Sequence, residues 1–304
     1  MIITPQFQAI KLSQSINLQV PLYIKREDLH PLGSHKGRSI PFIIEKHTED
    51  GIKNFVISSS GNAGLASALT IQEYNQRHPE SKVSLEIFVG KKIPRHKLKN
   101  ITDVIKIPEI TIQQIKNPKQ TAFQIEKNSI DKNGKITVKF LRQSTDENAI
   151  LGYFELAKEL SEIKDLDAIF IPTSSATCAE GLHNAFKKIG INPQIHIVQT
   201  DTCPTIAKNF YEDIPNPPST PSLAGAIVDN VGHRSQNVIK LIKNSHGMAW
   251  IADNNEIRES VRIIKKTTNL DISPNSALSL VGLAKALKLD WKFEGPVVLL
   301  FTGN

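Results

Sequence analysis

Short apolar stretches rich in β-branched residues recur along the chain and predict buried strands. They cover residues 22–25, 55–60, 83–89, 104–107, 136–140, 168–173, 195–200, 248–252 and 297–304. Between them, apolar residues recur three and four positions apart, which predicts helices. The clearest helical patterns cover residues 63–75, 149–160 and 256–267. This alternation predicts an α/β fold with largely parallel sheets, whose ligands bind where strands lead into helices.

Composition places the chain among ordinary globular proteins. Its 304 residues suffice for one large domain or two of average size, with 39% hydrophobic and 22% charged residues. No run of about 18 apolar residues occurs, and the start of the chain lacks the basic and apolar regions of a signal peptide. We therefore expect a cytoplasmic protein that has no membrane partner.

Charge and cysteine spacing argue against two other classes of protein. The net charge is +7, but the densest basic stretch, residues 90–100, carries no interleaved aromatic residues. We interpret it as a solvated surface loop, and we expect no nucleic-acid partner. Cys178 and Cys203 have neither the spacing nor the neighbouring histidines of a metal site, so we expect no metal and no disulfide. The glycine patterns of NAD-binding and ATP-binding loops are also missing.

A lysine stands at one of the predicted loop-to-helix junctions. Lys36 follows a Gly-Ser turn, and we expect a helix to begin near Ser39. A helix N-terminus disfavours a cation, which favours the neutral amine that can attack an aldehyde. Taken alone, the position is more typical of an ordinary surface lysine.

Two further junctions carry small polar residues. After the strand at residues 55–60, the side chains of Ser60 and Asn62 and several backbone N–H groups could bind an anion. An N-capped helix after a strand would show the same pattern. After residues 168–173, the turn from Ser174 to Thr177 could hold a phosphate, although it contains no glycine.

These segments together resemble the pyridoxal-phosphate enzymes with the tryptophan synthase β-subunit fold, known as fold type II. This group contains threonine synthase, serine/threonine dehydratases and cysteine synthase. Its cofactor lysine lies in a K-x-E-D-x-x-P-x-G-S-x-K-x-R stretch, matched here by KREDLHPLGSHKGR, residues 25–38. The resemblance spans the chain, from the Thr4-Pro5 pair to the closing FTGN.

The resemblance implies a two-domain architecture. Residues 1–39 and 146–304 would form the large domain that binds pyridoxal 5'-phosphate, and residues 40–145 the small domain. The active site would lie in the cleft between the two domains. Relatives are commonly dimers, so the resemblance also implies a homodimer.

Specific residue roles follow from the same resemblance. Lys36 would hold the cofactor as a Schiff base, and Asn62 would hydrogen-bond the phenolic oxygen of the cofactor. Thr302 would face the pyridine nitrogen. The substrate carboxylate would face Ser59, Ser60 and Gly61. The cofactor phosphate would bind at Ser174, Ser175, Ala176, Thr177 and Cys178.

Thr302 bears on the type of reaction. Unlike a carboxylate, a hydroxyl group does not hold a proton on the pyridine nitrogen, so the ring is a weaker electron sink. This arrangement resembles enzymes that expel a leaving group from the β or γ carbon more than it resembles transaminases. Lys36, released by the incoming amino acid, would move the proton at Cα.

Within the family, the C-terminal half is most similar to threonine synthase. Residues 221–257, 272–286 and 149–160 carry the similarity, the last matching a helix written G-Q-K-T-x-x-x-E. It implies replacement on a phosphorylated homoserine.

Three departures from that pattern keep other activities open. The position of the arginine that would bind the substrate phosphate falls on or near Ala149, and no arginine lies closer than Arg142. Gly37 replaces an aspartate, and the phosphate turn lacks glycine. The prediction is a lyase or synthase acting on a small amino acid by elimination or replacement. The alternatives are a serine/threonine dehydratase, a cysteine synthase-like enzyme, or a non-catalytic protein that binds pyridoxal phosphate.

Several other conspicuous residues are expected to be structural. His35 should pack or cap because neighbours in an extended turn point in opposite directions. Asp253 and Glu256 are predicted helix caps. The Cys178 side chain is expected to fill space.

Overall fold

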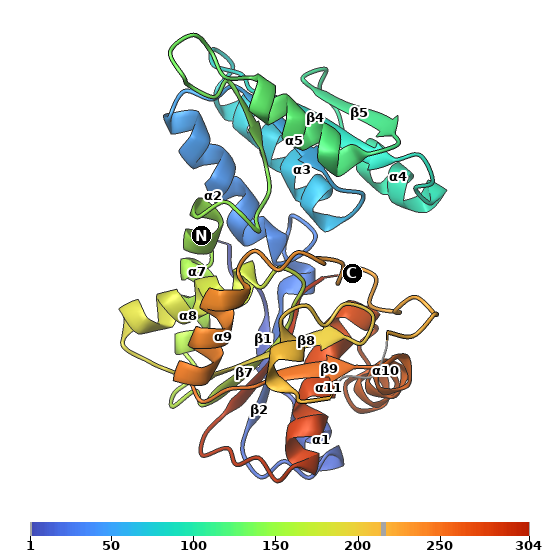
Figure 1. The fold of residues 1–304 in the computed structure, drawn as a ribbon. Helices are drawn as coiled ribbons and strands as arrows, with labels where there is room; N and C mark the ends of the chain where they lie inside the picture. Colours follow the sequence, from blue (N-terminus) through green and yellow to red (C-terminus); the bar gives the residue numbers. More distant parts are fainter. Residues whose placement is uncertain (1, 214–216, 304) are drawn as a thin grey trace. The chain divides into compact units, whose positions relative to one another are not determined.

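The chain folds into two compact units (Figure 1). We describe them from a computed structural model, which covers residues 2–213 and 217–303. The first unit contains Met1–His30 and Tyr153–Asn304, and the second contains Pro31–Gly152. This division assigns residues 31–39 and 146–152 to the second unit, whereas the predicted large domain included them. The units are defined by contacts alone, so the domain assignment made from the sequence stays a prediction.

The first unit is built on a mostly parallel sheet with the strand order β1-β2-β10-β7-β8-β9. Only the pairing of β1 with β2 is antiparallel among its described strands. Strands β7 and β10 are buried along their whole length, as expected for the centre of a parallel sheet. The strands are β1 (Gln6–Gln8), β2 (Leu22–Arg26), β7 (Ala168–Pro172), β8 (Gln194–Thr200), β9 (Ala249–Ala252) and β10 (Val297–Phe301).

Helices cover both faces of this sheet and bury a separate core on each (Figure 1). One core lies under α7 (Phe154–Ser161), α8 (Thr177–Ile189) and α9 (Ser235–Asn244). The other lies under α1 (Ile10–Ser15), α10 (Asn254–Thr268) and α11 (Pro274–Lys288). Two short 3-10 helices, η1 (Glu27–Leu29) and η2 (Ala207–Phe210), complete the described elements of this unit.

The second unit has a parallel sheet of its own, with the order β5-β4-β3-β6. Its strands are β3 (Asn54–Ser58), β4 (Ser84–Gly90), β5 (Ile110–Ile115) and β6 (Val138–Phe140). Its helices are α2 (Lys36–Glu49), α3 (Asn62–Arg77), α4 (Arg95–Thr102), α5 (Pro118–Asn128) and α6 (Asn148–Leu151). The larger core of the unit lies between α2, α3 and the sheet. The predicted α/β fold with mostly parallel sheets flanked by helices is confirmed.

The strand predicted at residues 104–107 is wrong. This segment is irregular, and the strand of this region is β5, which begins at Ile110. The Gln72 side chain accepts a hydrogen bond from the N–H of Lys106 and donates one to the carbonyl of Val104. Because a side chain of α3 satisfies these backbone groups, the segment does not need a neighbouring strand.

The helix predicted at residues 149–160 is two helices, α6 and α7, separated at Gly152 and Tyr153. A Cβ atom at Gly152 would lie 2.5 Å from the carbonyl oxygen of Arg38 and 2.7 Å from the Cα of Ser39. The helical pattern therefore breaks where the chain passes directly against the first turn of α2.

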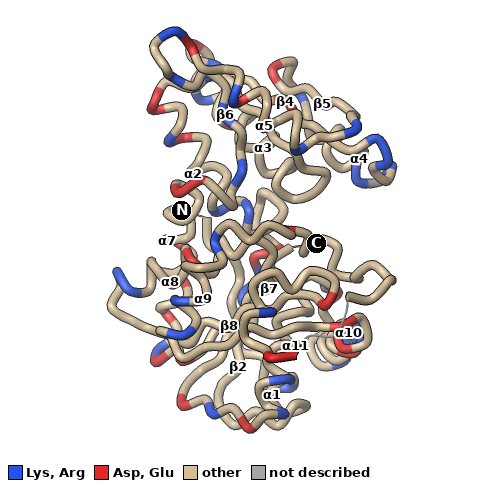
Figure 2. The backbone as a smooth tube through the Cα atoms, in the orientation of Figure 1, with Lys and Arg blue, Asp and Glu red and all other residues tan. Residues whose placement is uncertain are grey.

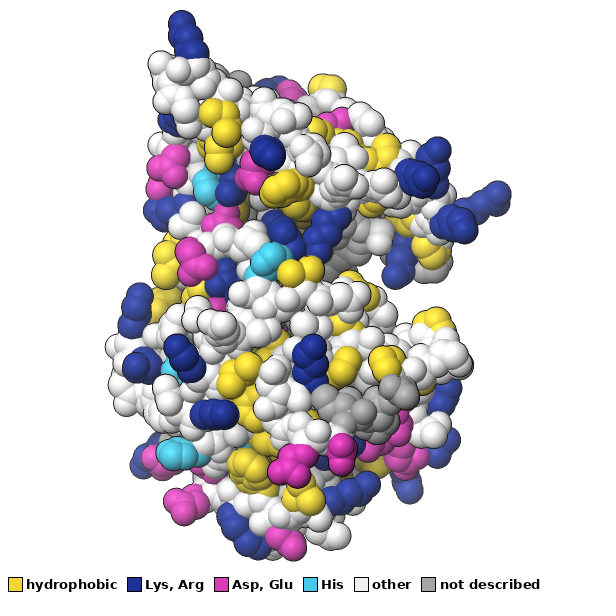
Figure 3. Space-filling model, viewed as in Figure 1, with side chains coloured by type: hydrophobic (Ala, Val, Ile, Leu, Met, Phe, Trp, Pro, Cys, Tyr) yellow, Lys and Arg dark blue, Asp and Glu magenta, His cyan; other side chains and the backbone are white. Residues whose placement is uncertain are grey.

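The basic stretch at residues 90–100 is not only a loop, because α4 begins within it at Arg95. Lys and Arg residues gather on α4 (Figure 2), and Lys97 and Lys99 are exposed. On the face shown in Figure 3, hydrophobic side chains are scattered among polar ones. Within residues 2–213 and 217–303, no helix combines the length and the apolar character needed to cross a membrane.

Candidate active site

Lys36 is the first residue of α2, so this helix begins at the lysine and not near Ser39 as predicted. The preceding turn reverses at Gly33, which has a φ of +85° and thus the left-handed conformation that glycine adopts at low cost. The backbone N–H of Lys36 donates to the Ser34 hydroxyl over 3.3 Å. His35 occupies the N-cap position without a side-chain capping bond, so the capping alternative for this residue is wrong.

Within the second unit, the Lys36 turn contacts the beginning of α3. A Cβ atom at Gly33 would lie 2.8 Å from a methyl carbon of Leu65, in the first turn of α3. The turn before α3 is equally close-packed, since a Cβ at Gly64 would lie 2.8 Å from the Ser59 carbonyl oxygen. The structure thus brings the turn that carries Lys36 next to the helix start that carries Asn62.

The turn from Ser59 to Gly61 connects β3 to α3 as predicted. The Ser59 hydroxyl accepts a hydrogen bond from the N–H of Gly61 over 3.3 Å. Gly61 is exposed, and Ser59, Ser60 and Asn62 are half-buried. These residues are therefore accessible, as contact with a substrate requires.

The first turns of α2 are held from behind by residues 141–152. The buried Gln143 side chain donates to the hydroxyl of the fully buried Ser39. Further along α2, the His47 ring lies 2.6 Å from the Asp146 carboxylate. Burial alone would raise the pKa of Asp146, but the hydrogen bond and charge of His47, helped by Lys139, bring it below its ordinary value. These contacts give the helix that carries Lys36 a rigid support.

In the first unit, the proposed phosphate turn connects β7 to α8. Ala176, at the N-cap of α8, has a φ of +62° and a ψ of +12°. This left-handed conformation costs a non-glycine residue about 1–2 kcal/mol. Followed by the right-handed residues of α8, it turns successive N–H groups toward one point and forms an anion-binding nest at a helix N-terminus. Ala176 thus adopts a conformation that glycine would adopt at lower cost.

The hydroxyl groups around this nest have different roles. The hydroxyls of Ser175 and Thr177 lie 3.0 Å apart beside the nest. The Ser174 hydroxyl instead accepts hydrogen bonds from the backbone N–H groups of Val228 and Asp229, over 3.1 and 3.2 Å. The Cys178 side chain is buried in the core of the first unit, which confirms that it fills space.

A buried ion pair lies close behind the nest. Glu180, in the first turn of α8, accepts a hydrogen bond from Arg234 over 2.9 Å, with side-chain exposures of 7% and 3%. Asn237 donates to the other carboxylate oxygen over 3.1 Å. Because Arg234 compensates the charge of Glu180, the acidic residue does not repel an anion held at the start of α8.

Thr302 lies on the same edge of the sheet as the nest. It directly follows β10, which pairs in parallel with β7, so both strands end at this edge. Thr302 is 95% buried, being only 5% exposed. The next residue is fixed by α11, because the hydroxyls of Ser273 and Ser276 both donate to the Gly303 carbonyl. The nest and Thr302 are therefore held by neighbouring strands of a rigid sheet.

Acidic residues mark the carboxyl ends of β8 and β9. Burial raises the pKa of Asp201, and the charges of Asp253 and Glu256 raise it further. A hydrogen bond from the backbone of Thr202 acts in the opposite direction and lowers it. Asp253 and Glu256 form a complete capping box at the start of α10, which confirms their predicted role.

In the described part of the chain, no group of three His, Cys, Asp or Glu side chains could hold a metal ion.

The charged residues of the lysine-containing motif form a buried network that was not predicted from the sequence. The ammonium group of Lys25 binds the Glu159 carboxylate, and the Thr4 hydroxyl donates to Glu27. Arg26 forms a bidentate ion pair with Asp28, in which Nη2 and Oδ2 lie 2.7 Å apart. Four consecutive charged residues at the end of a strand, in a segment otherwise read as buried, are the signal that could have indicated this network.

A family model described as "Pyridoxal-phosphate dependent enzyme" matches residues 2–303. The chain therefore belongs to the family of pyridoxal-phosphate dependent enzymes, and its cofactor is pyridoxal 5'-phosphate. A threonine synthase of Bacillus sp. (strain ULM1) is 25% identical to it over 321 residues, which cover 99% of this chain and 82% of that protein.

Two solved structures of pyridoxal-phosphate enzymes illustrate the likeness in fold. Processed threonine deaminase isoform 2 of Solanum lycopersicum superposes with a TM-score of 0.77 at 19% identity, covering 99% of this chain and 83% of that one. Maize serine racemase superposes with a TM-score of 0.78 at 17% identity, covering 99% and 87%. The fold is that of fold type II enzymes.

The residues present fit this cofactor. A phosphate needs convergent N–H donors, which the nest at Ala176 supplies together with two hydroxyl groups. An aldehyde needs a primary amine, which Lys36 offers at a helix start, and a ring nitrogen needs a polar partner such as the Thr302 hydroxyl.

Proposed function

We propose that this protein is a lyase or synthase, similar to threonine synthase, that acts on a small amino acid by elimination or replacement at the β or γ carbon. The observation that carries this proposal is the position of Thr302 at the end of β10, on the edge where β7 leads into the nest at Ala176. A hydroxyl group at that position favours loss of a leaving group over transamination.

In this proposal the chain's own residues have distinct tasks. Bound pyridoxal phosphate supplies an electron sink for the Cα of the amino acid. Lys36 carries the cofactor and then moves a proton at Cα, and Asn62 orients the cofactor through its phenolic oxygen. Thr302 binds the ring nitrogen. Ser59, Ser60 and Gly61 bind the substrate carboxylate. The cofactor phosphate binds at Ser174, Ser175, Ala176, Thr177 and Cys178, with Cys178 contributing its backbone N–H.

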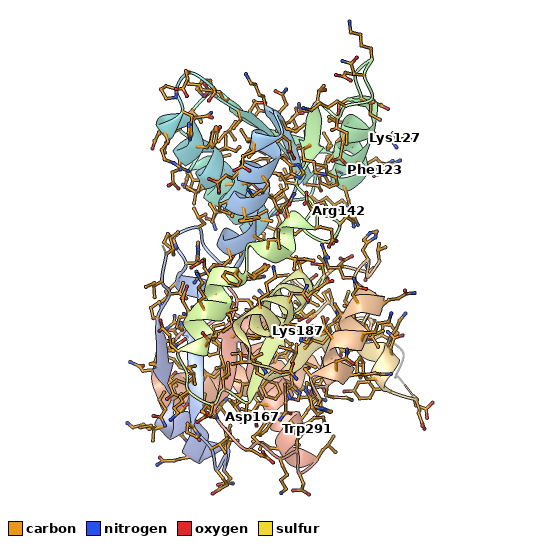
Figure 4. The ribbon with its side chains drawn as sticks, turned by 90° about the vertical axis from the view of Figure 1, so that its left-hand side faces the viewer. Phe123, Lys127, Arg142, Asp167, Lys187 and Trp291 are labelled. Atoms are coloured by element: carbon orange, nitrogen blue, oxygen red, sulfur yellow. The ribbon has the colours of Figure 1, made fainter. Side chains whose placement is uncertain are left out.

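A dehydratase acting on serine or threonine is the second candidate, and one observation favours it. Ala149, which replaces the arginine expected for a substrate phosphate, is fully buried in the core of the second unit. Arg142 lies in the segment before α6 and is half-buried (Figure 4). A side chain cannot bind substrate from the position of Ala149, so a phosphorylated substrate would need another cationic partner.

The cellular setting remains part of the proposal. From the resemblance we propose a cytoplasmic homodimer that takes part in amino-acid biosynthesis. The oligomeric state can be measured by analytical ultracentrifugation of the purified protein with its cofactor.

Turnover of a substrate panel tests the proposed function. Purified protein with bound cofactor would be given O-phosphohomoserine, L-serine, L-threonine, and O-acetylserine with sulfide, using Lys36→Ala as the inactive control. Phosphate release with threonine formation supports the threonine synthase-like activity, and keto acid with ammonia supports the dehydratase. Cysteine formation would support the cysteine synthase-like alternative. A protein that binds the cofactor but turns over none of these substrates would contradict the proposal and support a non-catalytic role.

A further inference from the structure

A long loop of the first unit carries exposed apolar residues beside the nest. Residues 222–234, called here the 222–234 loop, precede α9 and are drawn in orange in Figure 1. Leu223, Val228 and Val231 on this loop are 41%, 66% and 58% exposed. Exposed apolar residues held beside a cluster of convergent polar groups are typical of ligand-binding sites.

The loop is fastened to the β7–α8 turn and to α8. The Ser174 hydroxyl accepts from the N–H groups of Val228 and Asp229, as described above. The Gln199 side chain donates to the Ser174 carbonyl over 3.2 Å, which fixes the serine from the other side. At the end of the loop, Arg234 pairs with Glu180 of α8 over 2.9 Å.

The other attachments of the loop lead toward Thr302. The Asn275 side chain accepts a hydrogen bond from the N–H of Ala226 over 3.0 Å. Asn275 lies in the first turn of α11, next to Ser276, whose hydroxyl donates to the Gly303 carbonyl over 3.1 Å. The loop is thus bound both to the proposed phosphate site and to the helix start that fixes the residue after Thr302.

From these attachments we infer that the 222–234 loop forms the wall that receives the substrate side chain, that Val228 determines which side chain is accepted, and that Ser174 positions this wall. The inference rests on the proposed function and narrows its substrate to an unphosphorylated amino acid whose side chain carries a methyl group or a short apolar stem. Val228 offers such a side chain an apolar contact, and its backbone is fixed directly by Ser174. Ser174 acts here as a positioning residue.

Hydrogen exchange tests the positioning role without relying on catalysis. In the purified protein, Ser174→Ala should make the amides of Val228 and Asp229 exchange at least tenfold faster, because their acceptor is lost. Ser175→Ala is the matched control, since the Ser175 hydroxyl lies 3.0 Å from the hydroxyl of Thr177 at the start of α8, and it should leave both amides unchanged. Unchanged exchange in Ser174→Ala would overturn the positioning role. If Ser174→Ala does not fold, Asn275→Ala should release the Ala226 amide in the same way.

Substrate selectivity tests the role of Val228. In Val228→Ser, the ratio of kcat/KM for L-threonine to that for L-serine should fall by about tenfold, because the methyl group of threonine loses its apolar contact. Leu289→Ser, which changes a 69% exposed leucine at the end of α11, is the matched control and should keep the wild-type ratio. An unchanged ratio in Val228→Ser would overturn the inference.

Different results would overturn the inferred substrate class and the proposed function. Preferred turnover of O-phosphohomoserine would overturn the substrate class inferred from Val228 and leave the proposed function intact. Failure to bind pyridoxal phosphate or to turn over any amino acid would overturn the proposed function, whereas hydrogen exchange would still decide how the loop is held.

Discussion

The ammonium group of Lys25 and the carboxylate of Glu159 form an ion pair whose side chains are only 1% and 5% exposed. Lys25 lies on β2 and Glu159 on α7, so the pair joins two elements that are distant in the sequence. Lys25 also donates to the Thr4 carbonyl over 2.9 Å, and the Thr4 N–H donates to Glu159 over 3.2 Å. The pair therefore also fastens the N-terminal segment to the sheet.

Removing one member of this pair should be costly, because it leaves a buried charge without compensation. We expect Lys25→Met to lower the free energy of unfolding by about 3–5 kcal/mol, and the double variant Lys25→Met/Glu159→Leu to recover at least half of that loss. Urea unfolding followed by tryptophan fluorescence reports on the first unit, which contains both tryptophans, Trp250 and Trp291. A loss of less than about 1 kcal/mol in the single variant would argue against the buried pair.

We expect Gly152 to tolerate no side chain, because it lies at the end of α6 directly against the first turn of α2. Gly152→Ala should destabilise the second unit by about 2–4 kcal/mol and weaken cofactor retention, because the new Cβ would overlap the backbone of Arg38 and Ser39. Gly90→Ala is the control, since no atom outside its chain neighbours lies within 4 Å of a Cβ there. Thermal unfolding and cofactor dialysis measure the two effects. Equal behaviour of the two variants would contradict the close approach at Gly152.

Substitution by glycine should have different effects on stability at two alanines near the proposed phosphate site. Ala176→Gly should leave stability unchanged or raise it by up to about 1 kcal/mol, because it relieves the left-handed conformation. Ala179→Gly, within the same helix, should cost about 1 kcal/mol or more. Urea unfolding of both variants gives the comparison. A clear loss of stability in Ala176→Gly would contradict the nest geometry.

His196 should make the first unit sensitive to acid. It is fully buried on β8, stacks on Phe170 with ring centroids 4.3 Å apart, and accepts a hydrogen bond from Trp250. Burial lowers its pKa from the ordinary value of 6.5 to about 3. As the pH falls below 6.5, the unfolded chain takes up a proton at this position and the folded chain does not. The contribution to stability is thus lost progressively between pH 6.5 and 3, at about 1.4 kcal/mol per pH unit.

The measurement is the free energy of unfolding at pH 6.5 and at pH 4.5. Wild-type protein should lose about 2–3 kcal/mol more over this interval than His196→Gln, which has no group to protonate there. Equal slopes in wild type and His196→Gln would show that His196 is not held neutral.

Much of the architecture could be predicted because burial imposes simple periodicities. The apolar runs at β7 and β10 are uninterrupted, so they indicated the central strands. The segment at residues 104–107 has the same apolar character but is satisfied by the Gln72 side chain, a tertiary contact that no local pattern contains. The break between α6 and α7 likewise depends on Arg38, which is distant in the sequence.

The candidate site was predicted from residue types at the junctions between strands and helices. The resemblance assigned Ser174 to the cofactor phosphate. The hydrogen bond that the Ser174 hydroxyl accepts from the 222–234 loop could not be predicted, because the two segments lie more than 50 residues apart in the sequence. The shortage of glycine in the phosphate turn suggested a weakened site, whereas the backbone at Ala176 takes the left-handed conformation without glycine. Such conformations are set by the surrounding packing and leave no local signature in the sequence.

Borohydride trapping identifies the lysine that carries the cofactor, which we assign to Lys36. Purified protein incubated with pyridoxal phosphate should be yellow, and borohydride should fix the cofactor irreversibly to one peptide, the one that contains Lys36. Lys25→Met is not a useful control because it is expected to be unstable, so Lys46→Ala, at a half-buried lysine in the last turn of the same helix, serves instead and should be labelled like the wild type. This assignment predicts that Lys36→Ala is colourless after dialysis and is not labelled. Labelling at another lysine, or an unchanged visible spectrum in Lys36→Ala, would contradict it.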